Sequence, residues 1–273
     1  MEILAASKVR PGQIAECLSE IGRHDPLIVP PRSGSMVGHF RAALIDNKVV
    51  GIGWLYRQGP RAEIDVRVIP KYRRAGVGGA LFDALTEGFN GAVHAGCDAG
   101  QKAAQKFVES RGFSLIEMLF AQRWDGELSD VPPAFGSVTL DIDGDVMDAV
   151  ELLDEAYGQS WSAPAFTPAD LQREDVDTWF ARREDELCGV LVARRSGDSW
   201  WVGGLGTRPN LRGQGIGRAL LCKTMTLAAQ QSRGVVLLVP ADSESVLRWS
   251  AGLGFWTYRS WAHYYRPRSD AGS

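Results

Sequence analysis

Apolar runs with glycine inside them alternate along the chain with segments whose apolar residues recur at helical spacing. The β-branched run VVGIGWL at residues 49–55 predicts a strand, and LCGVLVA at 187–193 has the same character. A second apolar run follows each of them and ends in proline, at Pro70 and at Pro209. In both places an arginine- and glycine-rich stretch comes next, and then an amphipathic helical pattern. The order of predicted elements is therefore the same in the two halves.

Both copies also close in the same way. A short strand, a helical segment and a glycine–phenylalanine pair end the first copy at Phe113 and the second at Phe255. Matching points lie about 140 residues apart, which is the size of one ordinary domain. The chain therefore reads as an internal duplication.

The segment DGELSDVPPAFGS at 125–137 is rich in Pro, Gly, Ser and Asp and lacks periodicity, which is typical of a linker. We therefore predict domains at residues 1–124 and 137–266, joined by a linker at 125–136. The polar segment at 267–273 is predicted to be a disordered tail.

The helical segments alternate with the predicted strands. Helices are predicted at residues 11–22, 76–89 and 101–111 in the first half and at 145–157, 215–233 and 243–252 in the second. Strands and helices that alternate in this way define an α/β architecture.

Composition narrows the class of protein. The chain has 273 residues, of which 45% are hydrophobic and 23% charged, as in ordinary globular proteins. No apolar run approaches the ~18 residues that a membrane span needs, and the start MEILAASKVR lacks the features of a secretory signal. We therefore expect a cytoplasmic protein with no membrane partner. The formal net charge of -3 leaves no basic field for nucleic acid.

The potential metal ligands are scattered. The 4 cysteines stand singly, and the 4 histidines show no spacing that is typical of a metal site. We therefore expect neither a disulfide framework nor a bound metal.

The stretch RPNLRGQGIGRALL places charge and glycine where a helix must begin. A helix N-terminus presents unpaired N–H groups and a partial positive charge, so an anion is stabilised there. Gly213, Gly215 and Gly217 lack the Cβ atoms that would keep an anion away. The chain has no GxxxxGK[ST] loop, and Arg218 stands where a dinucleotide fingerprint needs another glycine. The pattern predicts a phosphate cradle of another kind.

The [RQ]-x-x-G-x-[GA] loop of the GNAT superfamily of acyl-CoA-dependent N-acyltransferases has this form. It occurs as Arg73, Gly76 and Gly78, and again as Arg212, Gly215 and Gly217. A single copy is also compatible with a simple tight turn, but the repetition in the same context favours the family. The chain thus resembles the GNAT superfamily twice, over most of residues 1–124 and 137–266. The first copy departs from the pattern at Arg74, where glycine is usual.

The resemblance implies a fold and a coenzyme. Each domain is expected to be a mixed, mostly antiparallel sheet flanked by helices, with a splayed pair of parallel strands. In this family the loop amides bind the pyrophosphate of acetyl-CoA, and the strand before the loop pairs with pantetheine. The implied coenzyme-binding residues of the second domain are Leu205, Gly206, Thr207, Arg212, Gly213, Gln214, Gly215, Ile216, Gly217, Arg218 and Ser243. Those of the first domain are Val68, Arg73, Arg74, Ala75, Gly76, Val77 and Gly78.

The implied reaction is direct attack of an amine on the thioester, with strand amides stabilising the oxyanion. An acid must then meet the leaving thiolate. Many members of the family carry a tyrosine on the last helix, and the matching positions here hold Val108 and Ser250. Ser250 is therefore the candidate acid, which favours chemistry in the second domain. Tyr264 and Tyr265 remain alternatives.

A base must take the proton of the amine. The strand that often carries a carboxylate in this family has Glu63 and Asp65 in the first domain, but only Trp200 and Trp201 in the second. Glu63 and Asp65 alternate with apolar residues, so a solvated strand face is the other interpretation. For the second domain a water relay stays open, as do the acids Asp175, Asp177 and Asp242.

The first functional hypothesis is an acetyl-CoA-dependent N-acetyltransferase that acts on the primary amine of a small molecule. The rival is a coenzyme A-binding regulatory or scaffold protein whose catalytic centres have degenerated. Acetylation of a protein is a third hypothesis. A homodimer is compatible with the sequence, and no nucleic-acid partner is expected.

Overall fold

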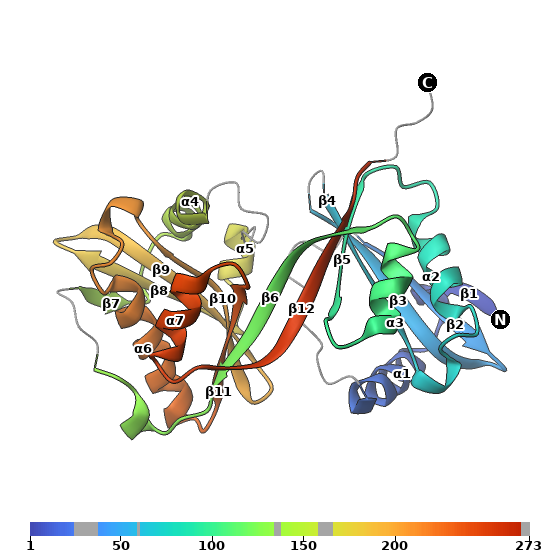
Figure 1. The fold of residues 1–273 in the computed structure, drawn as a ribbon, viewed down its shortest axis with the longest axis horizontal. Helices are drawn as coiled ribbons and strands as arrows, with labels where there is room; N and C mark the ends of the chain where they lie inside the picture. Colours follow the sequence, from blue (N-terminus) through green and yellow to red (C-terminus); the bar gives the residue numbers. More distant parts are fainter. Residues whose placement is uncertain (25–37, 59–60, 134–137, 158–165, 269–273) are drawn as a thin grey trace. The chain divides into compact units, whose positions relative to one another are not determined.

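The computed structural model describes residues 1–24, 38–58, 61–133, 138–157 and 166–268 (Figure 1). The chain forms two compact units. The first unit comprises Met1–Glu117 and Ala262–Ser273, and the second unit comprises Met118–Trp261.

Two strands pass from one unit into the other. Strand β6 (Ser114–Trp124) begins in the first unit and ends in the second, and β12 (Trp256–Arg266) runs from the second unit into the first. The compact units therefore differ from the predicted domain bounds, because each half gives its last strand to the other. Backbone pairing is the same for either partner, so the apolar pattern of a last strand does not reveal which sheet it joins. Positions 134–136 of the predicted linker and 269–273 of the predicted tail lie outside the described residues.

The first unit is a sheet with the strand order β1-β2-β3-β4-β5-β12. Its elements are β1 (Glu2–Ala5), α1 (Pro11–His24), β2 (Gly38–Ile45), β3 (Lys48–Gln58), β4 (Arg61–Val68), α2 (Val77–Thr86), β5 (Ala92–Asp98) and α3 (Lys102–Glu109). Strands β1 to β4 are antiparallel neighbours, and β4 and β5 are parallel.

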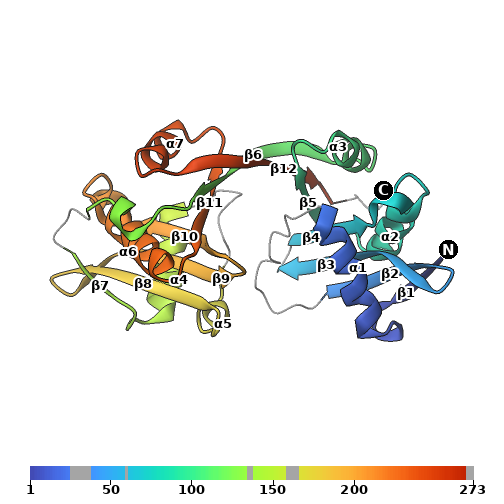
Figure 2. The same ribbon diagram turned by 90° about the horizontal axis from the view of Figure 1, so that it is seen from below.

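Helices α1 and α2 cover opposite faces of this sheet (Figures 1 and 2). Cys17 and Ile21 of α1 pack in one apolar cluster with Ile52. Val77 of α2 packs in a second cluster with Val68. The side chains of the sheet are thus directed to both faces, toward α1 on one and α2 on the other, as the strand period of two requires.

The second unit repeats this plan with the strand order β12-β6-β11-β10-β9-β8-β7. Its other elements are β7 (Thr139–Asp141), α4 (Val146–Tyr157), α5 (Pro168–Leu171), β8 (Val176–Arg183), β9 (Glu186–Ser196), β10 (Ser199–Thr207), α6 (Ile216–Gln230), β11 (Gly234–Pro240) and α7 (Glu244–Ala251). Strands β10 and β11 are parallel, and the other pairs between β7 and β11 are antiparallel.

Apolar clusters pack on both faces of the sheet in the second unit. Leu153 of α4 packs with Phe180 and Val190, whereas Leu220 of α6 packs with Leu191 on the opposite face. The predicted α/β class is confirmed, with a mixed and mostly antiparallel sheet flanked by helices in each unit.

The predicted helices are found within a few residues of their expected ends, and α5 was not predicted. Among the described residues no helix combines the length and the apolar character that crossing a bilayer requires.

Candidate functional site

The parallel strands of the second unit come apart before they end. Pairing between β10 and β11 stops at Val202 and Leu237, although β10 continues to Thr207. Beyond Val202 one backbone edge of β10 is therefore not covered by β11. A ligand with amide groups can pair with such an edge as an added strand would.

The first unit has the same splay. Pairing between β4 and β5 stops at Ile64 and Ala95, although β4 continues to Val68. The splayed parallel pair that the resemblance implied is thus present in both units.

A β-bulge is present in the second unit at a place where the first unit has none. The register of β10 against β9 shifts between Val202 and Gly204, whereas β4 pairs with β3 without a shift. The glycines at the bulge admit Phe166, because a Cβ on Gly203 would meet its ring at 3.2 Å and one on Gly204 at 2.8 Å. Bulges re-aim the backbone that follows them, so the amides beyond Gly204 are directed differently from those of β4.

Tyr157, the last residue of α4, reaches the uncovered edge of β10. Its hydroxyl accepts a hydrogen bond from the Leu205 N–H at 3.0 Å and lies 3.4 Å from the Leu205 carbonyl oxygen, to which it donates. Burial raises the pKa of Tyr157, and the hydrogen bond to Leu205 opposes this shift. The phenol therefore carries its proton at neutral pH. The sequence placed Tyr157 at the end of a helix, but no spacing showed that it reaches the strand.

Each glycine-rich loop ends in a glycine whose backbone is left-handed. Gly215 has φ 85° and precedes α6, and Gly76 has φ 79° and precedes α2. No side chain caps either helix, so the first-turn N–H groups face outward without a side-chain acceptor. A Cβ added to Gly213 or to Gly76 would meet no atom within 4 Å. The loops thus leave open space where an anion fits against a helix N-terminus.

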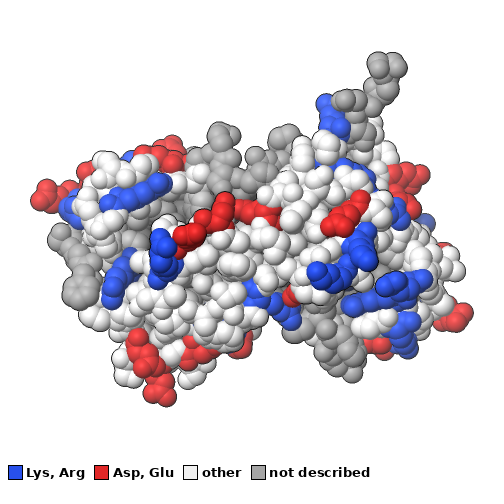
Figure 3. All heavy atoms as spheres, viewed as in Figure 1, with Lys and Arg blue, Asp and Glu red and all other residues white. Residues whose placement is uncertain are grey.

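Arg74 adopts the same left-handed conformation with φ 66° as the matching Gly213 with φ 77°. Its side chain therefore stands at a position that is bare in the second unit. Lys and Arg side chains gather over the part of the first unit where Figure 1 places α2 and α3 (Figure 3). This positive charge favours an anion near the first loop as well.

The loop arginines hold the loops in place. The Arg212 guanidinium donates to the Ala156 carbonyl oxygen at 2.7 Å, and the Arg73 Nε donates to the Val68 carbonyl oxygen at 3.0 Å. Gln214 accepts a hydrogen bond from Arg183 at 2.9 Å. These three side chains, predicted to contact phosphate, thus fix the loops to neighbouring elements, and the backbone amides remain the candidate anion-binding groups.

The remaining predicted coenzyme residues lie on β10 and at the starts of helices α6, α7 and α2. Gly206 and Thr207 follow Leu205 on β10, Ile216, Gly217 and Arg218 form the first turn of α6, Ser243 is the N-cap of α7, and Ala75, Val77 and Gly78 surround the start of α2. Ile216 and Val77 are buried, so only their backbone can face a ligand.

Ser250 lies in the interior of the second unit. It is 0% exposed, and its hydroxyl donates to the Gln122 side-chain oxygen at 2.5 Å. The Val246 and Leu247 carbonyl oxygens lie at 2.9 Å and 3.1 Å from the same hydroxyl. Gln122 belongs to β6, the strand that comes from the first half. This geometry favours a structural role for Ser250 over the acid role that the sequence suggested.

The acids considered for the second domain are tied to arginines or stand away from the splay. Asp175 pairs with Arg173 at 2.9 Å and with Arg194 at 2.6 Å, and these contacts lower its pKa to about 2. Asp177 pairs with Arg195 at 3.0 Å, although burial raises its pKa. Both lie at the β8 end of the sheet, and Asp242 lies between β11 and α7. None of them has a contact with the uncovered edge of β10 in the described structure.

The carboxylates of the first unit stand on a half-buried face. Asp65 pairs with Arg67 at 2.6 Å, and the Arg67 guanidinium lies 5.4 Å from the centre of the Trp54 ring. Glu63 stands opposite His94 on β5. Burial raises the pKa of Tyr56, and the negative charges of Asp65 and Glu63 raise it further. Glu63 and Asp65 therefore lie on a partly solvated face beside a buried histidine, and their catalytic role stays a prediction.

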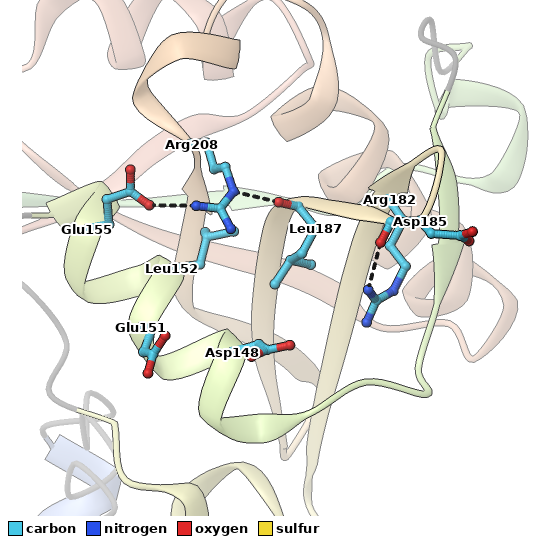
Figure 4. Close-up of a pocket in the computed structure, with 8 residues that line it drawn as sticks. All are labelled: Asp148, Glu151, Leu152, Glu155, Arg182, Asp185, Leu187 and Arg208. Carbon is cyan, nitrogen blue, oxygen red and sulfur yellow. Dashed lines mark hydrogen bonds and ion pairs between the residues drawn. The ribbon is translucent and has the colours of Figure 1, made fainter.

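A cavity of about 430 Å³ lies beside α4 in the second unit (Figure 4). Its rim carries Asp148, Glu151, Glu155 and Asp185, with Arg182 and Arg208 between them. Arg208 donates to the Leu187 carbonyl oxygen at 2.7 Å and pairs with Glu155 at 3.1 Å. Carboxylates outnumber arginines here, so the cavity does not suit the phosphates of a coenzyme. Among the described residues no cluster of three or more His, Cys, Asp or Glu could hold a metal ion.

A splayed parallel strand pair beside an uncapped, glycine-led helix is the arrangement that the resemblance to acyltransferases implied, and this chain contains it twice. It belongs to the Acetyltransferase (GNAT) family, which it matches over residues 15–113 and 146–255. It is therefore an acyltransferase enzyme with two such domains in tandem.

Two bacterial relatives are similar to this chain over most of its length. The mycothiol acetyltransferase of Kocuria rhizophila is 26% identical over 258 residues, which is 85% of this chain and 85% of the relative. The mycothiol acetyltransferase of Streptomyces coelicolor is 28% identical over 267 residues, or 89% of this chain and 83% of the relative.

Two solved structures share the fold over nearly the whole chain. A tandem GNAT protein from the clavulanic acid biosynthesis pathway has a TM-score of 0.75 at 17% identity and covers 99% of both chains. A GCN5-related N-acetyltransferase from Sphaerobacter thermophilus has a TM-score of 0.73 at 18% identity and covers 98% of this chain and 97% of that one.

Proposed function

We propose that this enzyme transfers the acetyl group of acetyl-CoA to the primary amine of a small molecule, by direct attack of the amine on the thioester. The observation that carries the proposal is the combination of an uncapped helix N-terminus at Gly215 with the uncovered edge of β10. Bound acetyl-CoA would supply the activated acetyl group, and the first unit repeats the same arrangement at Gly76 and β4.

The backbone of the second unit would hold the coenzyme. The N–H groups at the start of α6 suit a diphosphate, since each charge-assisted hydrogen bond contributes about 1.5–3 kcal/mol. The polar groups of Leu205 and Thr207 suit the amides of pantetheine. The bulge at Gly204 and the bare Gly213 favour tighter coenzyme binding in the second unit than in the first.

We propose that the acceptor is a small amine. The substrate that the names of the mycothiol acetyltransferases indicate is not assigned to this chain. Two positions count against assigning that substrate to this chain. Ser250, where many family members have tyrosine, is buried and hydrogen-bonded. Trp201 stands where the first unit has Glu63, because both occupy the second-last pair of the parallel strands.

The second candidate is a coenzyme A-binding regulatory protein with degenerate centres. The buried state of Ser250 and the contact of Tyr157 with Leu205 favour it, because both remove polar groups from the wedge of the second unit.

Turnover separates the two candidates. Acetyl-CoA is incubated with the enzyme and a panel of amino sugars, amino acids, diamines and aryl amines, and released thiol is measured against a reaction without enzyme. Amine-dependent thiol release supports the transferase. Coenzyme binding without release over the whole panel supports the regulatory protein.

A further inference from the structure

Proton-carrying side chains gather at one point of the first unit, where β4 and β5 come apart. We propose that His94 and Glu63 form an acid–base centre there, and that β12, the last strand of the chain, completes it with His263 and Tyr265. This inference rests on the proposed acetyl transfer and places the reacting thioester at the wedge of the first unit, where the uncapped helix at Gly76 would hold an acetyl-CoA of its own.

The position of the centre follows from strand register. Glu63 stands opposite His94, and the next pair, Ile64 with Ala95, is the last before the splay. Neighbours at one register position of a sheet project from the same face. Val66 and Val68 pack with α2, so Glu63 and His94 lie on the other face, toward α1. Both side chains thus stand at the apex of the wedge.

The returning strand β12 brings two more groups to the same face. The Tyr265 ring centre lies 4.9 Å from that of His94, and the His263 ring centre lies 6.1 Å from it. Both histidines are buried: His94 is 7% exposed and His263 is 4% exposed. Alternate residues of β12 share a face, so His263 and Tyr265 point the same way. The N-terminal half alone could not build this cluster.

The second unit has no such group at the matching place. Its second-last pair is Trp201 with Val236, and neither side chain exchanges protons at neutral pH. The contrast assigns proton transfer to the first unit, whose loop also presents an uncapped helix at Gly76.

The surroundings of the centre suit a cationic amine. Trp54 already carries the Arg67 guanidinium over its ring at 5.4 Å, so this face accommodates a cation beside an aromatic side chain. The negative charges of Asp65 and Glu63 raise the pKa of Tyr56 nearby, in addition to burial. The same negative potential favours an ammonium group.

His94 would accept one proton from the ammonium group and release it to solvent. The freed lone pair of the nitrogen attacks the thioester carbonyl carbon, forming the C–N bond as the C–S bond breaks. The nitrogen gives up a second proton, which the cluster passes to the leaving thiolate. An ammonium and a thioester thus yield an amide, a thiol and one solvated proton.

The test compares His94→Gln and Glu63→Gln with the wild type, using the amine that gives the fastest turnover in the panel. We expect kcat to fall at least about tenfold in each variant, because general acid–base catalysis contributes about 10²–10⁴-fold. The affinity for acetyl-CoA, measured by calorimetry, should stay within about twofold. His39→Gln is the control, because His39 is exposed on β2 of the same unit.

Histidine NMR gives a readout that does not depend on turnover or on variant folding. The wild type is titrated with propylamine, putrescine, glucosamine and phenethylamine, and the signals of the imidazoles are followed. At least one of these amines should shift the His94 and His263 signals and leave the His39 signal in place. Tyr265→Phe, as the variant of a positioning residue, should weaken that shift.

The outcomes are distinguishable. Wild-type turnover that persists in His94→Gln within about twofold, or titrations in which no amine moves the His94 signal, would overturn the inference and leave acetyl transfer standing. A wild type that binds acetyl-CoA but turns over no amine would overturn the proposed function itself. A fall in kcat together with the NMR shift supports both.

Discussion

The Tyr157 hydroxyl accepts a hydrogen bond from the Leu205 N–H at 3.0 Å, on the edge of β10 that β11 leaves uncovered. Leu205 is one of the residues expected to pair with pantetheine. A coenzyme that pairs with Leu205 must therefore displace the hydroxyl first, and its apparent affinity is reduced by the strength of this contact.

Tyr157→Phe should bind acetyl-CoA about two- to tenfold more tightly than the wild type, because a net hydrogen bond contributes about 0.5–1.5 kcal/mol. Calorimetric titration measures the change. Tyr264→Phe is the matched control, since it removes a buried phenol that lies 3.3 Å from Glu109 in the first unit and does not touch β10. Weaker coenzyme binding by Tyr157→Phe would show instead that the hydroxyl contacts the bound coenzyme.

Ser250→Ala should destabilise the protein by about 1–3 kcal/mol, because the buried Gln122 side-chain oxygen loses its donor. Urea unfolding gives the free energy. Coenzyme affinity and kcat should stay near wild-type values. A variant of normal stability with little turnover would restore Ser250 as the acid that the sequence suggested.

Asp175→Asn should lower the free energy of unfolding at neutral pH, where the carboxylate pairs with Arg173 and Arg194. These arginines depress the folded pKa of Asp175 from its usual 3.8 to about 2. A depressed pKa stabilises the folded state above the unfolded value, and that contribution falls as pH drops from about 4 toward about 2.

The difference between wild type and Asp175→Asn should therefore shrink between pH 6 and pH 3 in urea titrations. It should be modest throughout, because the Asp175 side chain is one third exposed and solvent screens the pair. A difference in the free energy of unfolding that grows toward low pH would contradict the ion pairs of Asp175 with Arg173 and Arg194.

Sequence patterns predicted what depends on local backbone chemistry. Gly76 and Gly215 are predicted at helix starts because a missing Cβ leaves room for an anion, and both precede a helix, with a left-handed backbone that the sequence pattern did not predict. The apolar pattern predicted the strands that end just before Pro70 and Pro209, and the resemblance implied the parallel splay; both features are found in the two units.

Long-range contacts could not be predicted from the sequence. The exchange of β6 and β12 depends on which sheet edge each strand meets, and it places Gln122 on Ser250 and Tyr265 on His94. For Tyr157 the sequence predicted only that it ends a helix. These contacts join residues far apart in the chain, and no periodicity records them.

The central claim is that backbone amides at the start of α6 hold acetyl-CoA, and calorimetry of wild type against Gly215→Leu tests it most directly. Gly197→Leu is the control, because Gly197 also has a positive φ, 58°, with nothing within 4 Å of an added Cβ, and lies in the turn between β9 and β10. Both substitutions impose the same kind of backbone strain, but only the first fills the anion space.

We predict micromolar binding by the wild type and by Gly197→Leu, as expected from a few charge-assisted hydrogen bonds to a diphosphate. The Gly215→Leu variant should lose that binding site while it remains folded. Equal heats from all three proteins, or no heat from the wild type, would contradict the account.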